Sequence, residues 1–241
     1  MVQYTEWRSI SDGSIISDIP DGAIHQWQLS EGSGNTASDA VGENDGDIQG
    51  PDWVSNSWFE GFALDGDGST DIVQCGVLDG LTESVISGEF AIVFTVQTTQ
   101  SDGYLGGMES GATAATIQIG NEAGSPPSGS LAPWVNDDNG DFLIQYSNTT
   151  IDDGDKYRCV CNMHGTDATA WEIWINAVDD GVSTELNQSP SNYSDGTNEF
   201  GWFDRGDQSS AVDCILDNMI IFDRHLTESE IENDYETQPW S

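Results

Sequence analysis

The stretch FAIVFTVQT, residues 90–98, is almost continuously apolar. A strand covered on both faces has this pattern, because neither set of alternating side chains meets water, although periodicity alone leaves a buried helix open. Further short apolar segments follow it between turn-rich clusters, at the spacing of about 8–12 residues typical of a β-sandwich. They are ATIQIGN (115–121), FLIQYS (142–147), YRCVCNM (157–163), WEIWINAV (171–178) and CILDNMIIFD (214–223).

The segments on either side of this block extend the pattern. IHQWQLS (24–30) alternates so that His25, Trp27 and Leu29 share one face of a half-buried strand. FALDGDGSTDIV (62–73) predicts a strand, a tight Asp/Gly turn and a second strand. LTESEIENDY (226–235) predicts a helix that starts with a capping box, in which Thr227 is the N-cap and Glu230 follows three residues later.

These patterns together predict the fold class and the domain organisation. A chain of 241 residues has room for one large all-β domain or two smaller ones, and we find no internal repeat or linker within residues 23–241. We therefore expect an all-β fold, a two-sheet antiparallel β-sandwich (jelly roll) over residues 21–241 with a short C-terminal helix. Residues 1–20 are expected to form an arm for docking or oligomerisation.

The charge of the chain is extreme, with 43 Asp and Glu residues against five Lys and Arg and a formal net charge of −38. Self-repulsion on this scale destabilises a compact protein unless salt screens it, so we expect a protein of a high-salt environment, from a halophilic archaeon or one of its viruses. Too few cations are present to neutralise a phosphate backbone, which excludes nucleic acid as a direct ligand. No apolar stretch approaches the ~20 residues of a membrane helix, so no membrane insertion is expected.

The chain resembles the laminin-G-like, concanavalin A-like lectin and glucanase jelly rolls over about residues 23–235. The resemblance is carried by the order and spacing of the stretches at 24–50, 62–73, 153–178 and 216–231, of which the last, LDNMIIFDRHLTESEI, is the most specific. Ala177 stands where that family usually has Gly, which implies a less tight turn. The resemblance implies a two-sheet jelly roll that is often a sugar-binding or adhesive module and only sometimes an enzyme.

The resemblance also implies a structural Ca²⁺ that ties the loop EGSGNTASDAVGENDG (31–46) to the closing strand. The expected ligands are Asp39, Asn44 or its backbone carbonyl, and Asp217, since Ca²⁺ takes six to eight oxygen ligands. The alternative is that Asp39 caps the turn through nearby backbone amides, as Asp readily does.

Other candidate sites are weaker. DGDGSTD (65–71) lacks the Gly and Glu that a calcium-binding EF-hand loop requires, so it predicts a hairpin turn. Cys159, Cys161 and His164 lack a fourth zinc ligand nearby, and we expect all four cysteines to be buried free thiols. Three acidic residues match the catalytic spacing of the glucanases that the chain resembles, but they fall in the predicted helix, where they do not share one face. We therefore expect a solvated helix end and no enzyme; the residues are Glu232, Asp234 and Glu236.

Aromatic residues beside Asp- and Asn-rich turns are the candidates for carbohydrate binding, because a ring can stack on a sugar while the acids take its hydroxyl groups. They are Trp134 with Asp137, Tyr193 and Trp202. Trp27, Trp171 and Trp174 lie in predicted strands and are expected in the core.

We therefore expect a non-catalytic, lectin-like adhesion module. The preferred setting is the surface of a haloarchaeal virion, as a tail fibre, spike or capsid decoration that binds glycans of a host surface layer. Residues 1–20 would contact other virion proteins, and a homo-oligomer is expected. The alternatives are a cell-surface or secreted module of a halophilic archaeon and, ranked last, a glycoside hydrolase or polysaccharide lyase.

Overall fold

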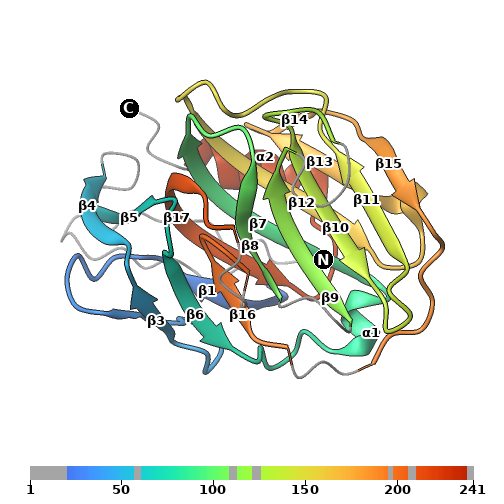
Figure 1. The fold of residues 1–241 in the computed structure, drawn as a ribbon, viewed down its shortest axis with the longest axis horizontal. Coiled ribbons are helices and arrows are strands. Elements are labelled where there is room, and N and C mark those ends of the chain that lie inside the picture. Colours follow the sequence, from blue (N-terminus) through green and yellow to red (C-terminus); the bar gives the residue numbers. More distant parts are fainter. Residues whose placement is uncertain are drawn as a thin grey trace.

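A computed structural model describes residues 21–56, 61–108, 113–120, 126–194, 198–205 and 210–237. Two antiparallel β-sheets face each other in it, and a short helix lies near the C-terminus (Figure 1). The predicted β-sandwich is confirmed. The predicted arm at residues 1–20 lies outside the described residues.

Sheet A is formed by strands from both ends and the middle of the chain. The strands are β1 (Ala23–Trp27), β4 (Asp52–Asn56), β5 (Gly61–Asp67), β7 (Glu89–Thr98), β12 (Lys156–His164), β13 (Glu172–Ile175), β14 (Val178–Asp179) and β17 (Asp213–Phe222). Their order is β14-β13-β12-β7-β17-β5-β4, and β1 pairs with β17 as well. The beginning of the described chain therefore lies against its closing strand.

Sheet B is formed by the remaining strands, and two short helical turns lie in the connections. The strands are β2 (Thr36–Ala37), β3 (Gly46–Gln49), β6 (Ile72–Gly76), β8 (Gly103–Met108), β9 (Ala114–Ile119), β10 (Leu131–Asn136), β11 (Phe142–Tyr146), β15 (Ser183–Asn187) and β16 (Phe200–Trp202). Their order is β15-β11-β10-β9-β8-β16-β6-β3-β2. The helical turns are α1 (Glu83–Ile86) and η1 (Ala168–Ala170).

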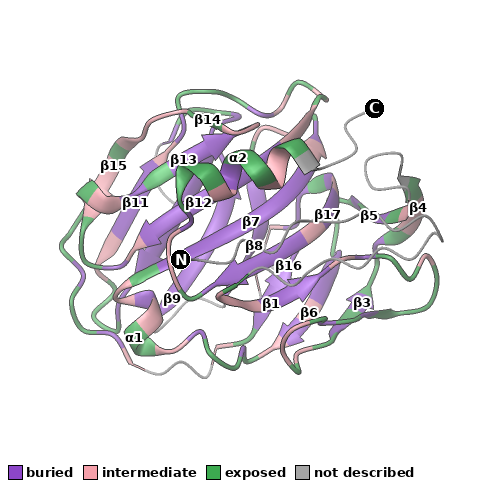
Figure 2. Cartoon of the chain, turned by 180° about the vertical axis from the view of Figure 1, so that it is seen from behind, coloured by how far each residue is buried: buried purple, intermediate pink, exposed green. Residues whose placement is uncertain are grey.

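Strand β7 is buried on both faces, as its apolar sequence predicts. Phe94 and Val96 belong to the core between the sheets, where the Phe94 ring lies 6.5 Å from the ring of Trp202 in sheet B. Ala91 and Val93 point to the outer face, where they pack in a second apolar cluster with Ile231 of helix α2 (Glu228–Thr237). Figure 2 shows α2 lying across the outer face of sheet A. The helix thus covers the face of β7 that sheet B does not reach.

An ion pair holds α2 to this face. Arg158 of β12 is 1% exposed, and its Nε and Nη2 donate to the two carboxylate oxygens of Asp234 at 2.8 and 3.0 Å. Its Nη1 donates to the carbonyl of Asn218 at 2.8 Å and to the hydroxyl of Thr95 at 3.2 Å. The helix prediction is confirmed, but the expectation of a solvated acidic end is wrong for Asp234, which neutralises a buried guanidinium.

All four cysteines are free and buried, as predicted. Burial raises the pKa of Cys159 to about 12 and raises that of Cys161 well above its ordinary value. These thiols stay protonated and unreactive inside the fold. Within the part of the chain that the structure describes, no helix has the length and apolar character needed to cross a membrane.

Candidate functional site

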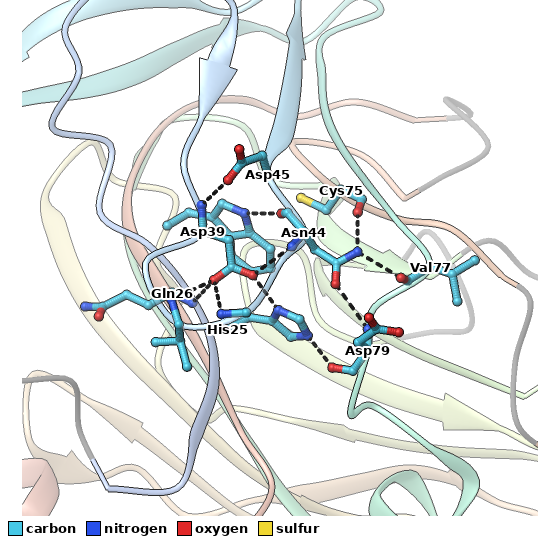
Figure 3. A network of polar contacts seen from close by, with 11 residues as sticks. His25, Gln26, Asp39, Asn44, Asp45, Cys75, Val77 and Asp79 are labelled. Atoms are coloured by element: carbon cyan, nitrogen blue, oxygen red, sulfur yellow. Dashed lines mark hydrogen bonds and ion pairs between the residues drawn. The ribbon is translucent and has the colours of Figure 1, made fainter.

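Asp39 of the loop 31–46 is at the centre of a buried polar network (Figure 3). Its carboxylate accepts hydrogen bonds on both oxygens. Oδ1 accepts from the backbone N–H groups of Gln26 (3.0 Å), Val41 (3.2 Å) and Gly42 (3.0 Å), and Oδ2 accepts from the backbone N–H of Asn44 (3.2 Å) and from the ring of His25 (2.7 Å). Burial alone would raise the pKa of Asp39, but the bonds from His25 and the backbone amides outweigh it and lower the pKa.

His25 is fully buried and lies between two acceptors. Its Nδ1 is 2.7 Å from Asp39 Oδ2, and its Nε2 is 2.7 Å from the carbonyl oxygen of Asp79. Because a neutral imidazole donates through only one nitrogen, making both bonds beside an ionised Asp39 requires hydrogen on both nitrogens. The ring also stacks on Trp27, with centroids 5.5 Å apart. The network is therefore a buried charge pair that joins β1 to two loops.

Asn44 locks the same loop to the end of β6. Its side-chain amide donates to the carbonyls of Cys75 (3.1 Å) and Val77 (2.9 Å), and its Oδ1 accepts from the backbone N–H of Asp79 (3.1 Å). Its own carbonyl accepts from the indole N–H of Trp27 at 2.9 Å. Every oxygen of Asn44 thus has a protein donor.

These residues do not fit a Ca²⁺ site. The N–H groups that point at Asp39 present their positive ends, which repel a cation, and Ca²⁺ needs free oxygen lone pairs. No group of three or more His, Cys, Asp or Glu residues is arranged around a metal position among the described residues. The third expected ligand, Asp217, is fully buried in β17. The loop is joined to that strand by backbone pairing of β1 with β17, in which Gln26 lies opposite Ile220. Asp39 is thus a backbone cap.

The four residues predicted to bind carbohydrate are buried. Trp134 is 1% exposed and donates to Gln118 at 3.0 Å, and Trp202 is fully buried against Phe200. Tyr193 donates its hydroxyl to the carbonyl of Gly165 at 2.5 Å. These three candidate rings are therefore not exposed for stacking on a sugar, because the rest of the sandwich covers their positions beside the turns.

Asp137 is also fully buried, and it organises two loops. Its carboxylate accepts four backbone N–H groups, and burial opposes but does not cancel their effect, so the pKa of Asp137 is lowered. The donors are Asn139 (2.9 Å), Asp141 (3.1 Å), Ser191 (2.9 Å) and Asn192 (2.9 Å). With both oxygens occupied, Asp137 has a structural role like that of Asp39.

A cavity of about 680 Å³ lies elsewhere, between the β13–β14 hairpin and the start of α2. A volume of this size is within the range of roughly 300–1,000 Å³ of small-molecule sites. Figure 2 shows α2 on the outer face of sheet A, on the side of the sheet where β12 and β13 lie. The lining residues are Glu172, Trp174, Ala177, Val178, Asp179, His225, Leu226, Thr227 and Glu228.

One wall of the cavity combines an indole and a carboxylate. Trp174 is 8% exposed, and its N–H donates to Oε2 of Glu172 at 3.2 Å. The same oxygen accepts from the side-chain amide of Asn162 at 2.9 Å. Val178 beside them is 65% exposed, which is unusual for a large apolar side chain in this protein. The wall thus offers a small apolar surface next to a fixed carboxylate.

The opposite wall is the N-terminus of α2 and the segment before it. The N–H and hydroxyl of Thr227 both donate to Oε2 of Glu230 at 2.8 Å, so the carboxylate-to-N-cap half of the predicted capping box is formed, while the Thr227 hydroxyl donates to the carboxylate. His225 makes a bond of 2.8 Å between its Nε2 and the carbonyl of Met163, so the proton of a neutral ring is on Nε2. The lone pair of Nδ1 is then available as an acceptor.

A strained turn closes the hairpin beside the cavity. Asn176 and Ala177 have φ angles of 53° and 58°, and the residues on either side pair directly, Ile175 with Val178. This is a two-residue hairpin turn of the kind in which both central residues are left-handed. Ala177 in place of Gly therefore does not loosen the turn, contrary to the expectation, and the alanine bears the strain instead.

The sequence does not predict this cavity, because Trp174 is correctly expected in the core and the residues beside its outer edge come from other parts of the chain. The two walls are about fifty residues apart in the chain, and β12 separates the hairpin from the middle of sheet A. The sequence nonetheless carried a signal for this site, namely an acidic residue two positions before a tryptophan (Glu172 and Trp174) and an acidic start to the predicted helix.

No family model and no curated protein matches the chain. Solved structures of similar fold include the receptor binding domain of botulinum neurotoxin C/D mosaic serotype (TM-score 0.65, 11% identity, 90% of this chain and 51% of that one). They also include the binding domain of Paraclostridial Mosquitocidal Protein 1 (TM-score 0.64, 14% identity, 89% and 52%) and Trypanosoma rangeli sialidase in complex with sialic acid (TM-score 0.59, 13% identity, 90% and 33%). The chain thus spans about half or a third of the chains it resembles, and at these identities the likeness establishes the fold alone. The chain has a β-sandwich that also occurs in the binding domains of a neurotoxin and of a mosquitocidal protein and in a sialidase.

Proposed function

We propose that the protein is a non-catalytic, glycan-binding β-sandwich module whose sugar site is the cavity between the β13–β14 hairpin and α2. The observation that carries this proposal is the combination of an indole edge, exposed Val178 and outward-facing carboxylates around about 680 Å³ of open volume. Sugars have apolar C–H faces and many hydroxyl groups, so a site for them needs an apolar contact and nearby polar groups.

The structural neighbours support a binding role. Two of them are titled as a receptor binding domain and a binding domain, and the sialidase structure is a complex with a sugar acid. In this protein the same fold would serve as an adhesive module, with loops and hairpins whose chemistry differs from that of the structural neighbours.

The biological setting of the proposal is the virion surface or another extracellular place in high salt, with host surface glycans as partners and with homo-oligomers of the module. The net charge of −38 supports the high-salt setting. Residues 1–20 would contact other virion proteins. A cell-surface adhesion module of a halophilic archaeon is the alternative setting with the same binding chemistry. Genomic neighbours that encode capsid or tail proteins would separate the two.

A glycan array in molar KCl tests the binding function. We expect at least one class of oligosaccharide to bind, and we expect Val178→Gln to weaken that binding about fivefold or more, because it removes the exposed apolar contact. Val77→Gln is the matched control, since Val77 is 44% exposed and does not line the cavity. An array without any binder would contradict the function, and equal effects of the two substitutions would contradict the location.

A further inference from the structure

The cavity wall has many hydrogen-bond acceptors and few free side-chain donors. Its side-chain N–H and O–H donors are the indole of Trp174, the ring of His225 and the hydroxyl of Thr227. Each already donates within the protein, to Glu172, to the Met163 carbonyl and to Glu230 respectively. A ligand in the cavity therefore finds few side-chain donors free to bind its own acceptors.

Acceptors are plentiful in the same wall. Glu172, Asp179 and Glu228 are exposed carboxylates that line the cavity, and His225 adds the lone pair of Nδ1. Because an ionised carboxylate only accepts hydrogen bonds, a partner for these oxygens must bring the hydrogens itself.

The charge of the wall has one sign. None of the nine lining residues, all of which the structure describes, is Lys or Arg. The nearby guanidinium of Arg224 is paired with the carboxylate of Glu230 at 2.8 Å, which offsets its charge. The positive end of the α2 dipole is opposed by Glu228 and Glu230 in its first turn. An anionic group brought into the cavity would meet like charges that nothing in the lining side chains compensates.

We infer that the cavity selects glycans that supply hydrogen-bond donors and positive charge, namely sugars with free amino groups, over neutral sugars, and that it rejects acidic sugars. This inference rests on the proposed function of the same site. It separates the protein from its structural neighbour that was solved with sialic acid, since a sugar carboxylate would face Glu172, Asp179 and Glu228.

Three tetrasaccharides with the same β-1,4-linked glucose backbone test the inference: fully deacetylated chitosan, with an amine at C2, cellotetraose, with a hydroxyl there, and glucuronan, with a carboxylate at C6. Calorimetric titration at about pH 7 lies above the ordinary pKa of a His side chain, about 6.5, and below that of an amino group, about 7.7–8.0. We expect the chitosan tetramer to bind about three- to tenfold more tightly than cellotetraose, and glucuronan to bind at least tenfold more weakly. Raising KCl from about 1 to 3 M should narrow the first difference, because added salt screens the charges further.

A charge-matched pair of double variants locates the effect. Asp179→Asn with Glu228→Gln removes two carboxylates from the wall, and we expect it to abolish the preference for chitosan while cellotetraose binds within about twofold of wild type. Glu43→Gln with Asp102→Asn removes two exposed carboxylates outside the cavity and should preserve the preference.

The outcomes separate the inference from the function on which it rests. Glucuronan that binds as well as cellotetraose, or chitosan that binds no better, overturns the inference while the sugar-binding function stands. Loss of the preference in both double variants also overturns it, because the selectivity would then come from the overall charge. The absence of any binding among the three tetramers overturns the inference, and the glycan array then decides separately whether the sugar-binding function stands.

Discussion

The buried carboxylate of Asp39 and the exposed carboxylates around the cavity differ in whether the protein itself supplies their hydrogen-bond donors. Asp39 is buried, and protein N–H groups occupy both of its oxygens. Glu172, Asp179 and Glu228 stand around an open cavity whose side-chain donors are already used elsewhere. A carboxylate that the fold has satisfied stabilises the fold, whereas carboxylates with unused acceptor capacity at a cavity are available to a ligand. Residue type alone does not distinguish the two cases.

The largest effect that we expect is the loss of the buried charge pair. Asp39→Asn removes the negative charge from beside the His25 ring and places amide hydrogens against the backbone N–H groups. We expect the free energy of unfolding to fall by about 3 kcal/mol, as when one member of a buried pair is removed. Denaturant unfolding in molar KCl measures the change, with the exposed Glu43→Gln of the same loop as control. A loss below about 1 kcal/mol would place Asp39 with the solvated carboxylates.

The pH dependence of stability follows from the same carboxylate. The pKa of Asp39 is lowered by folding, so its contribution is present above the ordinary Asp pKa of about 3.9 and is lost as the pH falls through the lower folded value. The stability difference between wild type and Asp39→Asn should therefore narrow in acid. A difference that is constant from neutral pH to about pH 2 would contradict this account.

Asp234→Ala extends the comparison to the helix that forms one cavity wall. It leaves the guanidinium of Arg158, which is 1% exposed, without its carboxylate, and we expect a loss of about 2 kcal/mol in stability. Glu232→Ala, an exposed position two residues earlier in α2, should cost less than about 0.5 kcal/mol. Equal losses in the two variants, measured by denaturant unfolding, would show that the ion pair does not hold the helix.

Ala177→Gly tests the strain at the cavity. Glycine adopts φ of 58° without the steric cost that alanine bears, so we expect a gain of about 1 kcal/mol in stability. Ala40→Gly is the control, since Ala40 is exposed and is not among the residues with positive φ, and it should lower stability slightly. Thermal unfolding of both variants measures the contrast. If Ala177→Gly proved less stable than wild type, packing of the Ala177 methyl group would outweigh the strain.

The smallest expected effect concerns carboxylates at the far edge of sheet A. Asp65 is paired across strands with Asp52, and burial together with Asp213, Asp52 and Asp71 raises its pKa. Since the charged form is disfavoured in the folded state, Asp65→Asn should raise stability by a few tenths of a kcal/mol at neutral pH. Wild type should approach the variant as the pH falls through the raised pKa, and molar salt should reduce the difference. A variant less stable than wild type in dilute salt would contradict the repulsion.

The fold followed from patterns that local physics determines. Burial of β7 on both faces was visible in its almost continuous apolar run, and the pairing of Thr227 with Glu230 at the start of α2 was visible as a spacing. Which side chains are exposed to solvent could not be predicted from local sequence patterns. Trp134 and Trp202 flank turns, but both indoles are buried in the core, where Trp202 packs on Trp27 and Phe94 of sheet A. The pairing of Arg158 with Asp234, 76 positions away, likewise depends on where α2 docks, and so does the cavity.

The four buried thiols can be used to measure how the sandwich unfolds. Cys75 lies on β6, Cys159 and Cys161 on β12, and Cys214 on β17, and all are buried with raised pKa values. Alkylating reagents attack thiolates, so labelling of each sulfur requires the surrounding strands to open. Mass spectrometry of labelled peptides over time would therefore show which sheet opens first when salt is withdrawn, and no cysteine has to be introduced by mutation.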